Sequence, residues 1–135
     1  MFSAAAEQGY TRAVVGLGHC YKNGEGVEEN PSEAVKLYTQ AVEKGNTDAM
    51  CHLGHCYQDG QGVEENLSEA VKLYTQAAER GNADAMTNLG YCYQYGWCGV
   101  SVDLSEARRY YQMAADKGHA DAVTALARLH SHNAP

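Results

Sequence analysis

The sequence predicts an all-α fold built from antiparallel helix pairs, and three observations lead to this prediction. Residues 18–53 align with residues 54–89 without a gap, and 27 of the 36 paired positions are identical. Apolar residues within each copy recur at the i, i+4, i+7, i+8 spacing of one helix face. Glycines mark the ends of two helices per copy, and cap residues mark the start of the second. Self-similarity at such a period is typical of stacked repeats that bury one another's apolar faces.

We expect the whole chain, residues 1–135, to form a single repeat array. Complete repeats are expected at residues 10–45, 46–81 and 82–118, and the third carries one extra residue between Tyr95 and Gly99. Residues 1–9 match the end of a second helix, and residues 119–135 match a first helix. Because neither end shows an atypical capping repeat, we expect truncated repeats there, as in an excerpt of a longer array.

The first helix of each repeat is expected near residues 11–22, 47–58 and 83–94. Its apolar face has the same residue types in the first two copies: Ala13, Leu17, Cys20 and Tyr21, then Ala49, Leu53, Cys56 and Tyr57. A glycine recurs inside this helix, at Gly18, Gly54 and Gly90. Since glycine within a helix costs about 1 kcal/mol relative to alanine, we expect a neighbouring helix to approach closely there.

The second helix follows a turn whose glycines are expected to take positive φ: Gly24, Gly26, Gly60 and Gly62. Each copy then has a capping box, in which Asn or Asp precedes Glu by three residues: Asn30 and Glu33, Asn66 and Glu69, Asp103 and Glu106. The apolar face in the first copy is Ala34, Leu37, Tyr38, Ala41 and Val42. A glycine ends each second helix, at Gly45, Gly81 and Gly118. Short loops make the two helices antiparallel.

These residues resemble a Sel1-like repeat, a relative of the tetratricopeptide repeat, over nearly the whole chain. In the second copy the pattern is Ala49, Leu53, Gly54, Tyr57, Gly60, Gly62, Val63, Ala70, Tyr74, Ala77, Ala78 and Gly81. The Gly-x-Gly-Val loop and the longer period distinguish it from the tetratricopeptide type. The resemblance implies a right-handed α-α superhelix in which the first helices line a concave surface.

The resemblance also implies a function, since members of this family act as adaptors that hold proteins together. We therefore expect a non-catalytic module that binds a protein or peptide through its concave face. The residues expected there are Arg12, His19, Lys22, Asn23, Asp48, Cys51, His55, Gln58, Asp84, Thr87, Tyr91, Gln94 and Tyr95, together with Val15 and Asp59. Tyr91 and Tyr95 are the expected anchors, because tyrosine offers a large contact area at a small cost in side-chain entropy.

The net charge of −7 and the sequence pI near 5.2 argue against a nucleic-acid ligand, which needs a basic surface. The same charge argues against binding to anionic lipid, and no apolar stretch predicts insertion into a membrane. Residues 1–9 lack the basic and apolar regions of a signal peptide. Cys20, Cys56 and Cys92 share one repeated slot, where we expect buried, unpaired thiols. Unpaired thiols weakly favour a reducing, cytoplasmic compartment.

Two other classes of function are open from the sequence, and neither is preferred. Cys51 and His55 are four residues apart on one helix and His19 would approach them, a set that suits zinc, but no fourth ligand is evident. Some cysteine-rich bacterial members of the family that the chain resembles were described as β-lactamases, and they carry paired cysteines bridging the two helices of a repeat. This chain has one repeated cysteine per repeat and no motif of a known catalytic site. We expect no enzyme, metal or cofactor.

The extra residue of the third repeat brings Trp97 and Cys98 into its loop. Trp97 could contact a partner or pack on the next helix, and the sequence favours neither. Cys98 is the cysteine that we expect to be most exposed and most reactive.

Overall fold

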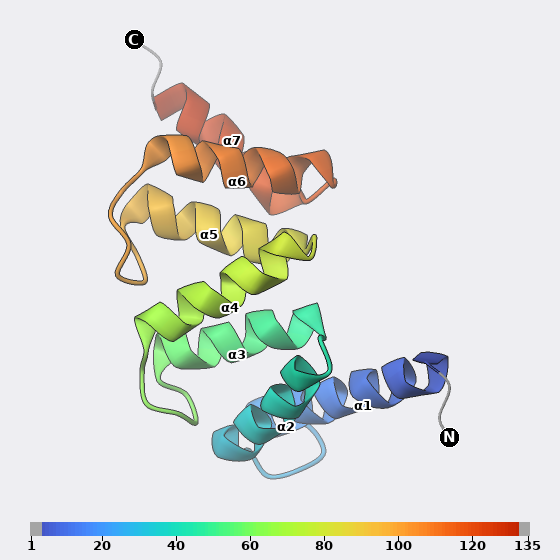
Figure 1. The fold of residues 1–135 in the computed structure, drawn as a ribbon. Coiled ribbons are helices and arrows are strands. Elements are labelled where there is room, and N and C mark those ends of the chain that lie inside the picture. Colours follow the sequence, from blue (N-terminus) through green and yellow to red (C-terminus); the bar gives the residue numbers. More distant parts are fainter. Residues whose placement is uncertain (1–3, 133–135) are drawn as a thin grey trace. The chain divides into compact units, whose positions relative to one another are not determined.

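The computed structural model describes the backbone of residues 4–132 and the side chains of residues 7–129. This part of the chain contains seven helices and no strands (Figure 1). The helices are α1 (Ala4–Asn23), α2 (Pro31–Glu43), α3 (Thr47–Asp59), α4 (Leu67–Glu79), α5 (Ala83–Tyr95), α6 (Leu104–Asp116) and α7 (Ala120–His132). The all-α fold predicted from the sequence is confirmed.

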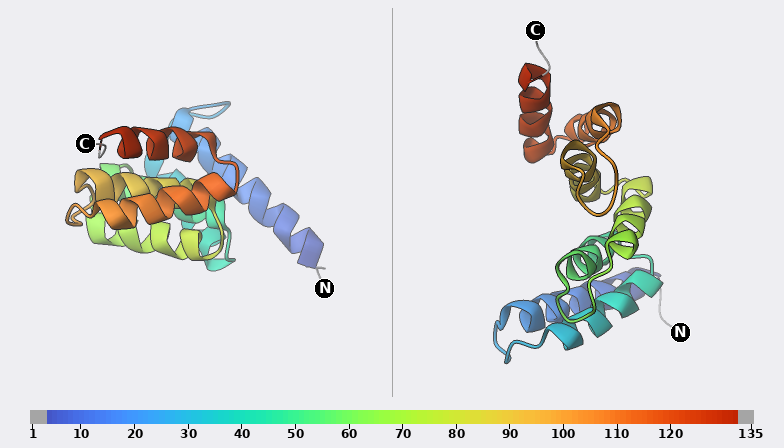
Figure 2. Two further views of the ribbon diagram at one scale, coloured as in Figure 1. Left: turned by 90° about the horizontal axis from the view of Figure 1, so that it is seen from above. Right: turned by 90° about the vertical axis from the view of Figure 1, so that its left-hand side faces the viewer.

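Helix contacts divide the chain into two compact units, Met1–Ala70 and Val71–Pro135, and the boundary falls within α4. In the first unit, α1 packs against α2, and α2 packs against α3. In the second unit, α5 packs against α6, and α6 packs against α7. The pairs α1–α2 and α5–α6 run antiparallel, as the views in Figures 1 and 2 show. Short loops between consecutive helices impose this arrangement.

One tyrosine of each second helix forms the centre of the core. Tyr38, Tyr74 and Tyr111 have no solvent exposure and are the largest fully buried side chains. Within the first unit the ring of Tyr38 fills the space over Gly18, where an added Cβ would stand 2.8 Å from Tyr38 Cε1. Tyr111 fills the space over Gly90 in the same way. The close approach expected at these two helical glycines is therefore confirmed.

The start of each second helix is capped as the sequence predicts. The side-chain oxygens of Asn30, Asn66 and Asp103 accept hydrogen bonds from backbone N–H groups three residues later, at 3.2, 3.1 and 3.1 Å. The backbone N–H of each cap residue donates to the first helix instead, to the carbonyls of Tyr21, Tyr57 and Tyr93 at 2.8, 2.9 and 2.8 Å. In a full capping box this backbone N–H would donate to the Glu side chain three residues later. Here it donates to the first helix and so fixes the loop against that helix.

The turn glycines have the positive φ that was predicted, between 67° and 77° at Gly24, Gly26, Gly60 and Gly62. Gly60 is the left-handed C-cap of α3, and its N–H donates to the carbonyl of Cys56. Glycine is needed there because a Cβ disfavours this backbone conformation.

The helix end expected near Gly9 is absent, because α1 continues through it from Ala4 to Asn23. The other first helices begin after Asn46 or Asn82, whose side chains accept a bond from the third backbone N–H of the helix. Tyr10 stands at the equivalent position and has no carboxamide oxygen with which to cap a new helix. The chain therefore continues as one helix.

The apolar face predicted for the first copy is also wrong in part. Ala13 is exposed and Leu17 is 44% exposed, whereas their equivalents Ala49 and Leu53 are buried as predicted. In the first unit α3 packs against the preceding helix α2, and no described helix precedes α1. One side of α1 therefore lacks the cover that this face has in the second copy.

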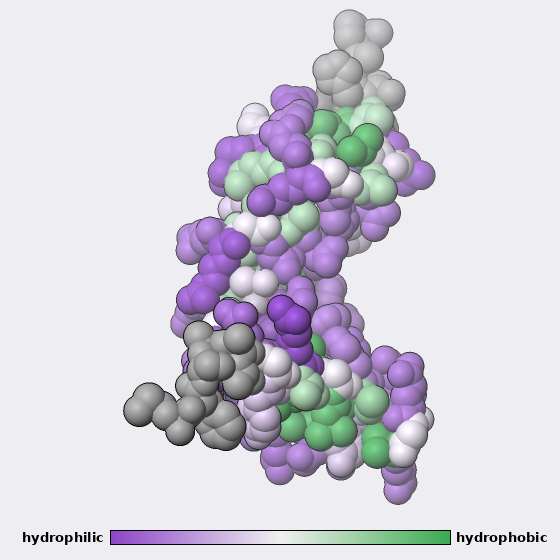
Figure 3. Space-filling model, turned by 90° about the vertical axis from the view of Figure 1, so that its right-hand side faces the viewer, coloured by the Kyte–Doolittle hydropathy of each residue, from purple (hydrophilic) through white to green (hydrophobic). Residues whose placement is uncertain are grey.

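On the face shown in Figure 3, hydrophobic residues gather in small patches among hydrophilic ones. None of the helices found between residues 4 and 132 is both long and apolar enough to cross a lipid bilayer.

Candidate functional site

Three exposed or half-exposed aromatic side chains gather at the end of α5, and we call them the aromatic patch: Tyr91, Tyr95 and Trp97. The ring of Trp97 stacks on Tyr95 at a centroid distance of 4.9 Å and lies 6.2 Å from Tyr91. Tyr95 is 54% exposed and Trp97 is 48% exposed. Trp97 packs against α5, the helix that precedes it, whereas the sequence left open either packing on the next helix or contact with a partner. About half of its side chain is open to solvent.

The buried core supports this patch from beneath. The ring of Tyr111 lies edge-on to Tyr91 at 5.7 Å, and its hydroxyl donates a 2.6 Å hydrogen bond to Gln94 Oε1. Tyr91 also packs against a cluster of buried residues that includes Ala125 and Leu129 of α7. Because Tyr111 is fully buried in that cluster, Tyr91 and Gln94 are held in place before any partner arrives.

A pocket of about 190 Å³ lies beside the patch, between α5 and α7. Its lining includes Tyr91, Tyr95, Asp121, Thr124 and Arg128. Burial raises the pKa of the Tyr91 phenol, the carboxylate of Asp121 raises it further, and the guanidinium of Arg128 lowers it. The pocket therefore combines aromatic walls with one group of each charge.

The α7 side of this pocket was not predicted from the sequence. Asp121, Thr124 and Arg128 follow the i, i+3, i+7 spacing of one helix face, so their common orientation was readable in principle. The sequence does not say that this face of α7 lies against the aromatic end of α5.

Two further candidates of the third repeat, Asp84 and Thr87, lie at the other end of α5. Asp84 Oδ1 accepts a 2.6 Å bond from His119 Nε2, and His119 Nδ1 lies 3.1 Å from Thr87 Oγ1. Asp84 is exposed, but Thr87 is only 3% exposed. The expectation that Thr87 faces a partner is therefore wrong, because its hydroxyl is directed into the corner between α6 and α7.

In the first unit, two expected contact residues are buried. Val15 is 7% exposed and Cys51 is 5% exposed, so neither side chain is open to a partner. Asn23, Asp48 and Asp59 are exposed, as expected. Apart from Arg12, the other candidates of this unit are half-buried: His19, Lys22, His55 and Gln58.

His19 belongs to a small ring cluster that the sequence did not reveal. His19 Nδ1 lies 2.7 Å from the hydroxyl of Tyr38, and its ring meets the ring of His52 edge-on at 4.3 Å. His52 also stacks on Tyr38 at 5.5 Å. Burial lowers the pKa of His19, and nearby Lys22 lowers it further. His52 was missed because Asn88 holds the same slot in the next copy, so nothing recurs there.

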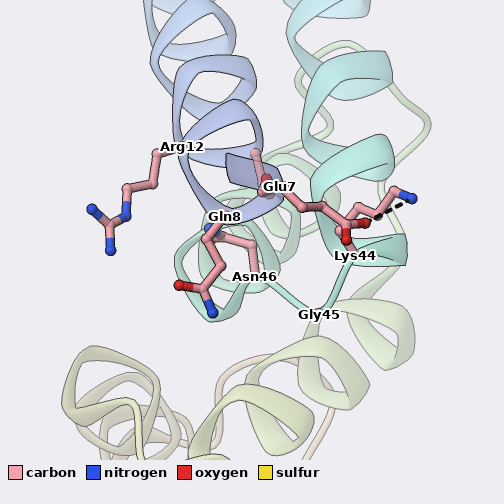
Figure 4. Close-up of a pocket in the computed structure, with 7 residues that line it drawn as sticks. Glu7, Gln8, Arg12, Lys44, Gly45 and Asn46 are labelled. Atoms are coloured by element: carbon pink, nitrogen blue, oxygen red, sulfur yellow. Dashed lines mark hydrogen bonds and ion pairs between the residues drawn. The ribbon is translucent and has the colours of Figure 1, made fainter. Parts of the chain in front are cut away.

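Arg12 lines a polar hollow of about 480 Å³ between α1 and the α2–α3 corner. Figure 4 shows Arg12 directed away from Glu7 and Lys44, which form a 3.2 Å ion pair with each other. Arg12 makes no ion pair with any residue whose side chain the structure describes. Its guanidinium is therefore available to an acidic group of a partner.

The cysteines differ from expectation at one position. Cys98 is 6% exposed, so the prediction that it is the most exposed thiol is wrong. Its positive φ of 58° belongs to a turn in which Cys98 Sγ lies 3.2 Å from Cys92 Sγ. Between residues 7 and 129, no group of three or more His, Cys, Asp or Glu side chains is arranged to hold a metal ion. Cys51, His55 and His19 therefore do not form the zinc ligand set considered above.

The Sel1 repeat model matches residues 11–46, 47–82 and 83–119. No curated protein sequence gives a significant match. Among solved structures, the chain is similar to c5321, a protective antigen present in uropathogenic Escherichia coli strains and displaying an SLR fold. The TM-score is 0.84 at 38% identity, over 95% of this chain and 27% of that one.

Two further structures are similar. A Sel1 repeat protein from Oxalobacter formigenes has a TM-score of 0.83 at 33% identity, over 93% of this chain and 50% of that one. Helicobacter pylori cysteine rich protein B has a TM-score of 0.72 at 25% identity, over 90% of this chain and 92% of that one. The chain thus spans about a quarter and a half of the length of the first two relatives.

Sel1 repeats in general are non-catalytic modules for protein interaction. With three consecutive repeats matched across residues 11–119, this chain belongs to the Sel1 repeat family.

Proposed function

We propose that this chain binds a segment of another protein through the side of its first helices that carries the aromatic patch, and that it does so without catalysis. The observation that carries the proposal is the exposed Tyr95–Trp97 stack beside Tyr91. The wider expectation, a concave face lined by the first helices of every repeat, is part of the same proposal. The patch is the part of that face with the strongest physical support.

The composition of the patch favours a protein or peptide ligand. Tyrosine and tryptophan dominate the binding energy of protein interfaces, because they bury large areas and lose few rotamers. Polar groups line the pocket together with Tyr91 and Tyr95: Gln94 on α5, and Asp121 and Arg128 on α7. An aromatic centre with a polar rim is the usual anatomy of such an interface.

The support beneath the patch lowers the cost of binding. The tilted contact with Trp97 and the edge contact with Tyr111 already restrict the ring of Tyr91 before a ligand arrives. Immobilising a free side chain at an interface costs about 0.5–1.5 kcal/mol, and that cost is reduced here.

The test selects peptide ligands from a random displayed library on the full chain and then measures their affinity. Trp97 is the only tryptophan, so its fluorescence reports directly on occupancy of the patch. We expect selected peptides to shift this fluorescence. We also expect a double variant, Tyr91→Ala and Tyr95→Ala, to bind at least tenfold more weakly, about 1.4 kcal/mol.

A matched control is Arg108→Ala, which removes an exposed side chain of α6 outside the patch and its pocket. It should leave the affinity unchanged. If the double variant keeps its helical circular dichroism and binds the peptides as tightly as the unmodified chain, the aromatic patch is not the binding site.

A further inference from the structure

The third repeat differs from the other two in placing a second cysteine against its helix cysteine. Cys92 Sγ and Cys98 Sγ lie 3.2 Å apart, and the two side chains are 1% and 6% exposed. Cys20 and Cys56 hold the slot of Cys92 in the earlier repeats, and the loops that follow them contain no cysteine. The pair therefore exists because of the extra loop residue.

The loop backbone holds the two sulfurs together. The N–H of Trp97 donates to the carbonyl of Cys92 at 2.9 Å, and the N–H of Val100 donates to the carbonyl of Trp97 at 3.2 Å. Cys98 lies within this turn and has a φ of 58°. Among residues 4–132 it is the only non-glycine residue with a positive φ. A side chain in this region costs about 1–2 kcal/mol, so an ordinary surface loop would favour glycine there.

We propose that Cys92 and Cys98 form a reversible intramolecular disulfide when the protein meets an oxidant of the disulfide class, such as oxidised glutathione. A disulfide has a sulfur–sulfur distance of about 2.05 Å, so the sulfurs must approach by roughly 1.2 Å. Rotation about the two Cα–Cβ bonds can supply a movement of this size. The bond would join the last turn of α5 to its own loop, unlike a bridge between the two helices of a repeat.

The exchange proceeds in two balanced steps. Cys98 loses its proton, and its thiolate attacks one sulfur of glutathione disulfide; the glutathione S–S bond breaks and one glutathione thiolate leaves. Cys92 then loses its proton and attacks the Cys98 sulfur of the mixed disulfide, which releases the second glutathione. The protein loses two hydrogens and is oxidised, and one glutathione disulfide is reduced to two thiols.

The order of attack follows from the surroundings of each sulfur. Burial raises the pKa of the Cys92 thiol, and its hydrogen bond to Cys98 raises the pKa further. A raised pKa leaves little thiolate, which is the reactive form. Cys98 lies in the loop between two positive-φ glycines, Gly96 and Gly99, so local opening of the loop exposes it first.

The location links the redox pair to the surface described above. Trp97 immediately precedes Cys98 and stacks on Tyr95. A disulfide at Cys98 would restrict the loop that carries Trp97, and with it the aromatic patch. This consequence for binding rests on the proposed function, whereas formation of the disulfide does not.

The test incubates the reduced full chain with oxidised glutathione in excess over reduced glutathione at pH 8. The protein is then denatured, its free thiols are alkylated, and it is digested with trypsin for mass spectrometry. Residues 81–108 lie between consecutive tryptic sites and contain Cys92 and Cys98 as their only cysteines. We expect more than half of this peptide to escape alkylation with a mass lower by two hydrogens, while the other three cysteines are alkylated. Trp97 fluorescence should change in parallel and recover on reduction.

Two variants sharpen the result. Cys98→Ser should abolish the mass change and the fluorescence change, whereas Cys56→Ser, which alters the equivalent slot of the second repeat, should leave both intact. Full alkylation of peptide 81–108, or a glutathione adduct on Cys98 that does not resolve, overturns the proposal. Because no ligand is needed, failure of the disulfide is distinguishable from failure of peptide binding. A selected peptide should then bind the oxidised and reduced forms with affinities that differ at least threefold.

Discussion

Gly18 lies directly over the ring of Tyr38, and a Cβ at position 18 would come within 2.8 Å of Tyr38 Cε1. The same relationship joins Gly90 to Tyr111. The missing side chain allows the tyrosine of the second helix to reach the first helix, where Tyr38 bonds to His19. Through this glycine position, the buried Tyr38 reaches His19, one of the residues expected to contact a partner.

The first prediction compares two glycines of α1 that are two residues apart. Gly18→Ala should destabilise the protein by about 1–3 kcal/mol, because the new methyl group overlaps a fully buried ring. Gly16→Ala should stabilise it by up to about 1 kcal/mol, because its Cβ meets nothing within 4 Å and alanine favours the helix. Urea unfolding followed by circular dichroism measures both. Equal effects of the two substitutions would contradict this account of the glycine slot.

The second prediction concerns stability at acidic pH. His52 Nδ1 is buried and has no hydrogen-bond partner among the described residues. Burial, and after it the nearby His19, Lys22 and His55, lower the pKa of His52 to about 4 against the opposing effect of Asp48. The unfolded chain, with a pKa near 6.5, therefore binds the proton first. Stability should be complete above pH 6.5 and decrease as the pH falls toward 4, by at most about 3 kcal/mol from this residue.

The repeat itself offers the control for this titration. Asn88 stands at the position of His52 in the next copy, so His52→Asn is a substitution that the fold already accommodates. The variant should lose less stability than the unmodified chain between pH 6.5 and 4. Some dependence should persist, because burial also lowers the pKa of His19. Identical curves of unfolding free energy against pH would show that His52 does not carry the effect.

The third prediction concerns the start of α7. His119 Nδ1 accepts a 3.3 Å bond from the backbone N–H of Ala122, so the histidine caps this helix where Asn46 and Asn82 cap α3 and α5. His119→Ala should lower the free energy of unfolding by about 1 kcal/mol, because it removes the residue that caps the helix. His119→Asn should cost less, because it restores the cap used by the other repeats. A smaller loss for alanine than for asparagine would refute the capping role.

The fourth prediction compares two turn glycines with nearly equal φ, 74° at Gly26 and 77° at Gly62. A Cβ at Gly26 would meet nothing within 4 Å, whereas one at Gly62 would overlap the backbone of Pro31 and stand 2.9 Å from Ser32 N. Gly26→Ala should cost about 1–2 kcal/mol from backbone strain alone. Gly62→Ala should cost at least about 1 kcal/mol more, because the backbone of α2 cannot move aside easily. Thermal unfolding of the two variants gives the comparison.

Much of the fold was predictable because its signals are local. The capping residues Asn30 and Asp103, the positive-φ glycines and the spacing of apolar residues each act within a few positions of the chain. Because the same signals recur in several copies, the helix pair of each repeat could be predicted more securely than from one copy. The absence of a helix end at Gly9 also has a local cause, because Tyr10 cannot cap a new helix. The alignment of the repeats predicted an end there because it matched Gly9 with Gly45.

The candidate site was predictable only in part. Helical spacing placed Tyr91, Gln94 and Tyr95 near one another, but it could not show that Cys51 and Thr87 are covered or that Leu17 is not. Spacing tells which side chains share a face, whereas exposure depends on what packs against that face. A local sequence pattern does not predict which helix or loop will pack against a given helix face.

By itself the sequence determined the helices, most of their ends and the close helix approach at Gly18 and Gly90, because hydrogen bonding, capping and backbone sterics operate over short stretches of chain. Tertiary structure alone decided that Trp97 stacks on Tyr95, that Arg128 of α7 lines the pocket beside Tyr91, and that Cys98 meets Cys92. These contacts depend on how a loop with one added residue closes and on which helix faces meet. Both are outcomes of packing in three dimensions, where residues far apart in sequence compete for the same space.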